Sequence, residues 1–165
     1  MFKYLPSFSI VMALENKLEN KYVPIIQHFR ANARVSLTDL SKKTRIPVST
    51  LFEKLKLFEQ NNWISKHTSL LNFQELGFDI RTQLLVKTSK KEEIQRFLIK
   101  NESVNNIFRI NNGYDFLIEA VFENMLAFDK FMKNMSEIGL EQFQEFFVME
   151  DLKREGFMEF NPIFN

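Results

Sequence analysis

The 165-residue chain contains no cysteine and only two histidines, His28 and His67. The lack of cysteine excludes disulfides, thiol catalysis and zinc sites with cysteine ligands. Both histidines precede residue 70, one on each side of a helical motif, so a metal site built on them is not expected. The chain also lacks a paired-carboxylate pattern, a nucleophile–base pattern and a phosphate-binding loop. We therefore predict no catalytic residue, no bound metal and no cofactor.

The first fourteen residues are mostly apolar, but they do not form a clear targeting signal. Pro6 interrupts the run, no small-x-small cleavage site follows it, and it is too short to span a bilayer. We expect this N-terminal extension, residues 1–17, to pack as a strand or short helix on the body of the protein or on a partner chain. Met12 is an alternative start. A cytoplasmic protein without a membrane partner is predicted.

Charge is divided unevenly along the chain, although the net charge is only +1. From Lys21 to His67 there are nine Lys and Arg against three Asp and Glu, a net of +6, which leaves −5 for the remainder. A basic lobe of this kind suits DNA phosphates, with an affinity that falls steeply with salt. Charge alone favours the simpler explanation, in which the charges only solvate two helical faces.

Residues 36–64 have the pattern of two short helices joined by a tight turn. Ser36 is placed to cap the first helix, with Asp39 at the capping-box position. Pro47 suits the start of the second helix, where a missing amide costs little. A preceding helix with Pro24 in its first turn completes a three-helix unit. This is the pattern of a helix-turn-helix, whose second helix enters the major groove of DNA.

The helical repeat divides the second helix into a buried and an outward face. The buried face is predicted to hold Val48, Leu51, Phe52, Leu55 and Phe58. The outward face is predicted to hold Ser49, Thr50, Glu53, Lys54 and Leu57. Small hydroxyls and a lysine on an outward face can reach base edges and phosphates.

After Ile64 the chain is predicted to form a short extended wing, where Lys66, His67 and Thr68 could touch phosphates. Glu53 could accept a hydrogen bond from a cytosine amino group, or it could hold a neighbouring lysine in place. The residues predicted to contact DNA are Lys43, Arg45, Ser49, Thr50, Glu53, Lys54, Lys56, Lys66 and His67.

Beyond a linker at residues 70–80, the hydrophobic pattern predicts the order β-α-β-β-α-β over residues 81–160. One helical stripe ends at Gly139, and Asn112-Gly113 marks a hairpin between the two middle strands. This order is that of a ferredoxin-like fold, one antiparallel sheet with two helices on a single face. The stripe consists of Phe128, Phe131, Met132 and Met135. The predicted fold class is α+β.

The last strand is predicted to be apolar on both faces. Phe147 and Met149 point one way, and Phe146 and Val148 point the other. A sheet with one face in water alternates more cleanly. An exposed apolar sheet favours a second copy packed face to face, which gives a two-fold homodimer. Two recognition helices related by a two-fold axis imply a pseudo-palindromic operator.

From about Leu18 to Gly156 the chain resembles the Lrp/AsnC, or feast/famine, regulators. Residues 18–69 resemble the family's winged helix-turn-helix, and two later segments resemble the turn and the last strand of its effector domain: NNGYDFLI and FFVMEDLK. The order and spacing of these pieces make the resemblance specific. It implies a transcription regulator that binds double-stranded DNA and dimerises through the C-terminal sheet. In the family, such dimers often assemble into octamers.

The resemblance also implies a small effector, such as an amino acid, bound between subunits. In the family the effector contacts cluster at the turn that corresponds to Asn111, Asn112, Gly113 and Asp115. Where the family has a glycine and then an acid, this chain has Asn112 and then Gly113, and it keeps only the later Asp115. The missing acid is a natural partner for a ligand ammonium. The Asn-Gly pair is also explained by a type I′ turn that needs positive φ at both residues.

Three classes of function follow. The first is a sequence-specific regulator that binds a pseudo-palindromic operator as a dimer or higher oligomer. The second is an effector-sensing or architectural protein whose helix-turn-helix has become a packing module, which the outward Leu57 would suit. The third is an enzyme similar to sirohaem decarboxylases, which share the two-domain pattern and are expected to use histidines in the C-terminal half. That half has no histidine here.

Overall fold

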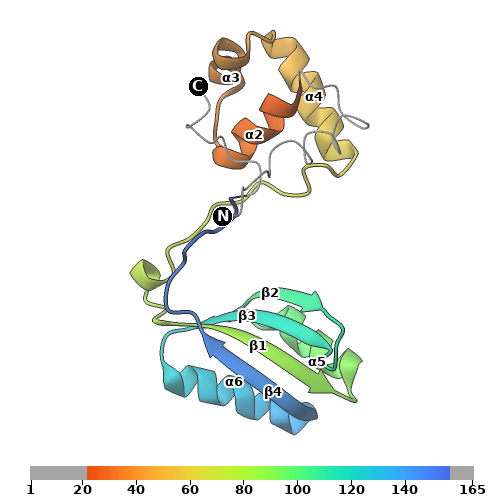
Figure 1. Cartoon of the computed structure of the whole chain (residues 1–165), viewed down its shortest axis with the longest axis vertical. Coiled ribbons are helices and arrows are strands. Elements are labelled where there is room, and N and C mark those ends of the chain that lie inside the picture. The colour runs from red at the N-terminus through yellow and green to blue at the C-terminus, as the bar shows by residue number, and fades with distance from the viewer. Residues whose placement is uncertain (1–21, 157–165) are drawn as a thin grey trace, which may run out of the picture. The chain divides into compact units, whose positions relative to one another are not determined.

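The computed structural model describes residues 22–156, which form two compact units (Figure 1). The helical unit comprises residues 22–70 together with 153–156, and the sheet unit comprises residues 71–152. The predicted N-terminal extension, residues 1–17, and the alternative start at Met12 lie outside the described residues.

The helical unit is built from three helices: α2 (Val23–Ala31), α3 (Leu37–Thr44) and α4 (Val48–Gln60). One apolar core joins them, and the indole ring of Trp63 stacks on Phe58 with ring centroids 5.4 Å apart. The buried residues of this core are Tyr22, Val23, Ile25, Phe29, Leu40, Leu51 and Phe58. The predicted order of three helices is confirmed.

Local capping signals set the helix ends as predicted. The Ser36 hydroxyl accepts a hydrogen bond from the Asp39 amide at 3.0 Å and donates to the Asp39 carboxylate at 2.7 Å. Pro47 is the N-cap of α4, and Pro24 occupies the first turn of α2. Because each signal acts within one turn of helix, its effect could be predicted from the sequence alone.

The sheet unit has the predicted order β-α-β-β-α-β. A short 3-10 helix, η2 (Gln74–Leu76), precedes it. The four strands are all antiparallel, in the order β2-β3-β1-β4 across the sheet. The elements are β1 (Ile80–Thr88), α5 (Lys91–Lys100), β2 (Val104–Arg109), β3 (Phe116–Phe122), α6 (Met125–Ile138) and β4 (Leu140–Phe147). This is the ferredoxin-like arrangement.

Both helices of the sheet unit cover the same face of the sheet. Leu84 on β1 and its cross-strand partner Ile118 on β3 are fully buried beneath them. The predicted stripe of α6 is confirmed, because all four of its residues are buried. The helix residues in this core are Ile94, Leu98, Phe128, Phe131, Met132 and Met135.

The opposite face of the sheet is not covered by these helices. Phe146 lies on this open face opposite Gln83, whereas Phe147 lies opposite Thr82 and contacts Phe128 at 5.6 Å between ring centroids. The prediction of apolar residues on both faces of the last strand is confirmed at these two positions. The prediction that the strand extends through Met149 is wrong, because β4 ends at Phe147 and is followed by one further backbone hydrogen bond, from the Val148 amide to the Arg81 carbonyl at 2.8 Å.

Candidate functional site

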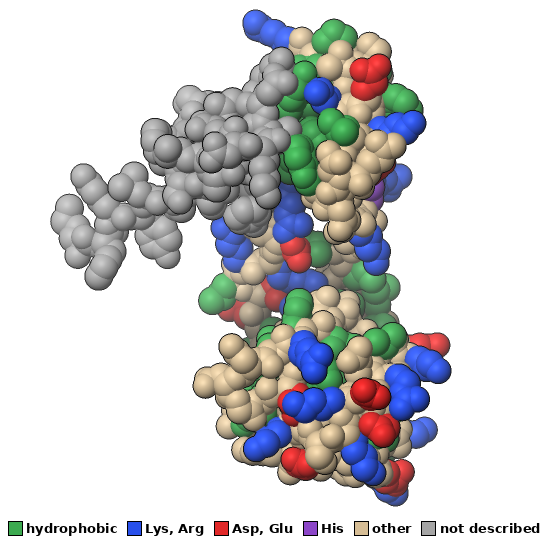
Figure 2. All heavy atoms as spheres, turned by 90° about the vertical axis from the view of Figure 1, so that its right-hand side faces the viewer, with side chains coloured by type: hydrophobic (Ala, Val, Ile, Leu, Met, Phe, Trp, Pro, Cys, Tyr) green, Lys and Arg blue, Asp and Glu red, His purple; other side chains and the backbone are tan. Residues whose placement is uncertain are grey.

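Basic side chains dominate the charge of the helical unit. Residues 22–70 contain eight Lys and Arg against three Asp and Glu. On the face drawn in Figure 2, the helical unit shows mainly basic charged groups, whereas acidic and basic groups alternate on the sheet unit. Three exposed cations lie together at the end of α3 and in the turn that follows: Lys42, Lys43 and Arg45.

The turn between α3 and α4 places an arginine where the backbone favours glycine. Arg45 has φ 58°, in the left-handed region, and its amide donates to the Ser41 carbonyl at 2.8 Å. A side chain in this conformation costs about 1 kcal/mol relative to glycine. The Arg45 side chain is exposed, so buried packing does not offset that cost. The left-handed residue ends α3 and leaves the Arg45 side chain at the surface of the turn.

Helix α4 is rotated relative to the face that the sequence pattern predicts. Leu51 and Phe58 are fully buried as expected, but Val48 is 43% exposed and Phe52 is 60% exposed. The prediction that these two residues belong to the buried face is therefore wrong. The observed outward face holds Val48, Ser49, Phe52, Glu53, Lys56 and Leu57.

The rotation is accompanied by a contact between Lys54 and Tyr22, at the start of α2. The Lys54 ammonium lies 4.2 Å from the centroid of the Tyr22 ring, so Lys54 is half-buried instead of outward. A lysine can turn inward in this way because its aliphatic stem packs on apolar surface and its charge is attracted to the ring. Thr50 is half-buried as well. The predicted outward positions of Thr50 and Lys54 are therefore wrong.

The predicted wing has little regular structure. Residues 65–72 form neither helix nor strand. Lys66 is exposed, but the His67 Nε2 atom lies 2.9 Å from a carboxylate oxygen of Glu59, and the ring packs edge-on against Phe29. His67 is thus held by contacts within the helical unit.

Seven of the nine residues predicted to contact DNA are exposed and lie near the turn, on the outward face of α4 or after it. One of them, His67, is already held by Glu59. The seven exposed residues are Lys43, Arg45, Ser49, Glu53, Lys56, Lys66 and His67.

The predicted effector turn lies in the sheet unit, between β2 and β3. Asn112 has φ 67° and Gly113 has φ 94°, the positive values that a type I′ turn requires. The Asp115 carboxylate receives the Thr88 amide at 2.9 Å and the Lys91 ammonium at 2.6 Å. These two groups lower the pKa of Asp115 and already occupy the carboxylate.

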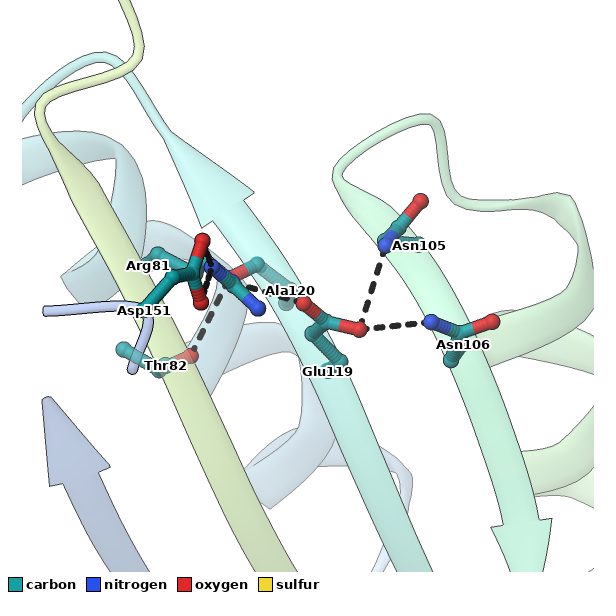
Figure 3. Close-up of polar contacts among 7 residues, drawn as sticks. All are labelled: Arg81, Thr82, Asn105, Asn106, Glu119, Ala120 and Asp151. Carbon is teal, nitrogen blue, oxygen red and sulfur yellow. Dashed lines mark hydrogen bonds and ion pairs between the residues drawn. The ribbon is translucent and has the colours of Figure 1, made fainter. Parts of the chain in front are cut away.

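A polar cluster that was not predicted from the sequence lies on the open face of the sheet (Figure 3). Glu119 is only 8% exposed, and its carboxylate accepts from Arg81 at 2.7 Å, from Asn106 at 2.5 Å and from Asn105 at 3.1 Å. Arg81 also binds both carboxylate oxygens of Asp151, at 2.6 and 2.7 Å. Burial opposes the charge of Glu119, but the hydrogen bonds from Asn106 and Arg81 outweigh it and lower its pKa.

A β-bulge brings the two asparagines to the same carboxylate. The register between β2 and β3 shifts between Val104 and Asn106, so that consecutive residues share one side of the sheet at this point. Strict alternation would have placed Asn105 and Asn106 on opposite faces. The sequence shows a lone acid, Glu119, inside the otherwise apolar strand β3, and this does not identify its partners.

Within residues 22–156, no group of three or more acidic or histidine side chains could hold a metal ion. The helices of this part of the chain include none with the length and apolar character needed to cross a membrane.

Residues 82–157 match the Lrp/AsnC ligand binding domain family. An uncharacterised HTH-type transcriptional regulator of Pyrococcus abyssi is 25% identical over 147 residues, which cover 87% of this chain and 98% of that protein. A transcriptional regulator of Neisseria meningitidis, crystallised with L-methionine, has a TM-score of 0.77 at 22% identity, covering 84% of this chain and 94% of its own. LrpC of Bacillus subtilis has a TM-score of 0.77 at 16% identity, and the match covers 83% of this chain and 98% of LrpC.

The chain joins a helix-turn-helix unit to a ferredoxin-like unit, and its curated relatives are HTH-type transcriptional regulators. Residues 82–157, which include most of the sheet unit, match the ligand binding domain of the Lrp/AsnC family. Its homologues are regulators, which is consistent with the prediction that it is not an enzyme.

Proposed function

We propose that this protein is a sequence-specific regulator that binds double-stranded DNA through α4 and the α3–α4 turn. The observation that carries the proposal is the cluster of exposed cations beside the start of α4, the end of a recognition helix that contacts base edges. The exposed Ser49 and Lys56 extend this surface along the helix. Cations at the turn suit phosphates, and side chains on the outward face of α4 suit the bases.

Selection of genomic fragments by the purified full chain tests this function. We expect a small set of fragments that share a pseudo-palindromic sequence, because two helices related by a two-fold axis read two similar half-sites. Fluorescence anisotropy on the selected fragments then measures their affinity against scrambled duplexes. If neither these fragments nor the promoter of the protein's own gene bind at low salt, the regulator function fails and the architectural alternative gains support.

We further propose that the active form is a homodimer joined through the open face of the sheet. Phe108 is 52% exposed and Phe146 is 53% exposed on this face, with Leu85 and Leu117 half-buried beside them. Exposed apolar area of this kind on a sheet is typical of an interface between two copies. Assembly of dimers into octamers stays a prediction from the family resemblance.

Replacing Phe146 by lysine is expected to weaken the homodimer about a hundredfold. Each dimer would lose two buried aromatic side chains, together about 3 kcal/mol, and would gain two cations near the two-fold axis. Sedimentation equilibrium measures the change. The matched control is Leu126→Lys, because Leu126 is 79% exposed but lies on α6, on the helix side of the sheet. Equal dimerisation of the Phe146→Lys variant and the wild type would place the interface elsewhere.

Replacing the left-handed Arg45 by glycine is expected to increase stability and to weaken DNA binding. Arg45→Gly is expected to raise the free energy of unfolding of the helical unit by about 0.5 kcal/mol, since glycine removes the left-handed strain but loosens the unfolded chain. The same variant is expected to bind operator DNA at least about tenfold more weakly, because it loses a charged contact in each subunit. Urea unfolding followed by Trp63 fluorescence and anisotropy with DNA measure the two effects.

Arg45→Ala is the matched variant for this experiment. It removes the same charge but keeps a side chain at φ 58°, so weaker DNA binding without added stability is expected. If Arg45→Gly and Arg45→Ala both bind DNA as tightly as the wild type does, the turn does not contact phosphates.

A small effector at the turn before β3 is supported by the family and opposed by the local contacts. The similar regulator of Neisseria meningitidis was crystallised with L-methionine, an amino acid with the ammonium group that an acidic side chain binds well. In this chain Lys91 already supplies an ammonium to Asp115 at 2.6 Å. An amino-acid effector at Asn111, Asn112, Gly113 and Asp115 would therefore share Asp115 with Lys91, displace Lys91, or bind without Asp115.

A further inference from the structure

Two apolar side chains stand exposed in the first two turns of α4. Val48 is 43% exposed and Phe52 is 60% exposed, and residues four apart on a helix lie on the same side. The core of the helical unit is already closed by Leu51 and Phe58, which are fully buried. Val48 and Phe52 therefore form an apolar strip that the three-helix core does not use.

The charges around this strip point to DNA as its occupant. Arg45 precedes it in the turn, and Lys56 lies one helical turn beyond Phe52 on the same side. These cations complement phosphates on either side of a groove. Glu53, exposed beside Phe52, repels phosphates, so the middle of this face is suited to base edges and not to the backbone.

In the major groove only one base edge offers an apolar group, the C5 methyl of thymine. A phenyl ring and a branched aliphatic side chain are the types of group that contact this methyl. We propose, on the basis of the DNA-binding function proposed above, that Val48 and Phe52 read thymine methyl groups and so determine the operator sequence. Each half-site should then carry thymine at one or two positions facing the start of α4.

The test removes the methyl group without changing any hydrogen bond. In the operator obtained by fragment selection, each thymine is replaced in turn by uracil, symmetrically in both half-sites, and affinity is measured with the full chain. At a contacted position the wild type should bind about three- to fivefold more weakly for each methyl lost. Phe52→Ala should bind the thymine and uracil duplexes with equal affinity at that position. Val48→Ala should bind them with equal affinity at the same thymine or at an adjacent one.

Leu57→Ala is the matched control, because Leu57 is 39% exposed on α4 but lies toward the other edge of its outward face. This variant should keep the wild-type difference between thymine and uracil. An unchanged urea midpoint and unchanged binding to non-operator DNA confirm that Phe52→Ala is folded and retains its phosphate contacts.

Two results would overturn this inference while leaving the DNA-binding function intact. One is a wild-type protein that binds its operator but does not distinguish uracil from thymine at any position. The other is that the Phe52→Ala and Val48→Ala variants both keep the full wild-type discrimination between thymine and uracil at every position. A protein that binds no duplex at all would overturn both the inference and the proposed function.

Discussion

The affinity of this protein for duplex DNA is expected to fall about a thousandfold when salt rises from about 50 mM to about 200 mM. In the proposed complex, one phosphate contact from each of the exposed residues Lys43, Arg45 and Lys66 would give six contacts per dimer. Each contact releases condensed counterions, and six of them correspond to a slope of about −5 in log affinity against log salt. Fluorescence anisotropy over a salt series measures this slope.

A charge-matched pair of variants distinguishes the proposed surface from general charge effects. Lys43→Gln combined with Arg45→Gln should reduce the magnitude of the slope by about 3 to 4, since four contacts per dimer are lost. Lys130→Gln combined with Lys133→Gln changes the net charge equally but alters exposed positions of α6 in the sheet unit. The second pair should leave the slope unchanged. Equal slopes for the two double variants would show that the helix-turn-helix does not supply the phosphate contacts.

Truncation of Glu119 is expected to destabilise the sheet unit by about 3 kcal/mol. Glu119→Ala would leave the half-buried guanidinium of Arg81 with Asp151 alone, and would remove the acceptor of Asn105 and Asn106 (Figure 3). The loss of the partner of Arg81 accounts for most of this cost, because Asn105 and Asn106 are exposed and can bind water instead. Urea unfolding followed by far-ultraviolet circular dichroism, at fixed protein concentration, measures the change.

Two further variants sharpen this experiment. Glu145→Ala removes an exposed carboxylate from β4 of the same sheet, and its effect should stay within about 0.5 kcal/mol. Glu119→Gln keeps an acceptor oxygen but not the charge, so it should lie between the wild type and Glu119→Ala. The transition followed by Trp63, which belongs to the helical unit, is an internal reference. Equal stability of the Glu119→Ala and Glu145→Ala variants would contradict a structural role for the cluster.

The same carboxylate makes the stability of the sheet unit depend on pH. Its pKa in the folded protein is lowered from the ordinary value of 4.5, and that of Asp115 is lowered from 3.8. A lowered folded-state pKa contributes stability above the unfolded-state value, and this contribution is lost as the pH falls through the folded-state value. The urea midpoint should therefore drop on acidification below about pH 4.5, and Glu119→Gln should reduce the drop.

Predictions from the sequence succeeded where the signal lies within a few residues. The cap at Ser36, the helix start at Pro47 and the positive φ angles of Asn112 and Gly113 all follow from local chemistry. The apolar stripe of α6 was also predicted correctly, since four large side chains at helical spacing leave one choice of buried face. The order of elements followed from these signals, and with it the ferredoxin-like fold.

Helix α4 shows where a pattern within one element is insufficient. A polarity pattern assigns Phe52 to the core and Lys54 to solvent, but Phe52 is exposed and the Lys54 ammonium lies over the Tyr22 ring. Tyr22 precedes α2, far from Lys54 in the sequence, so the pattern within α4 contains no trace of this contact. The residues that face outward were therefore partly mispredicted, although the helix itself was not.

The sequence by itself determined the helices, the strands and their order, because capping, turn formation and hydrophobic periodicity are interactions between near neighbours in the chain. Only the tertiary structure decided which polar and charged side chains are exposed and which are held by other residues. The rotation of α4, the capture of Asp115 by Lys91 and the bulge that aims Asn105 and Asn106 at Glu119 all depend on distant partners. Their physical reason is the same in each case: a charged or polar group takes the partner that folding brings within reach.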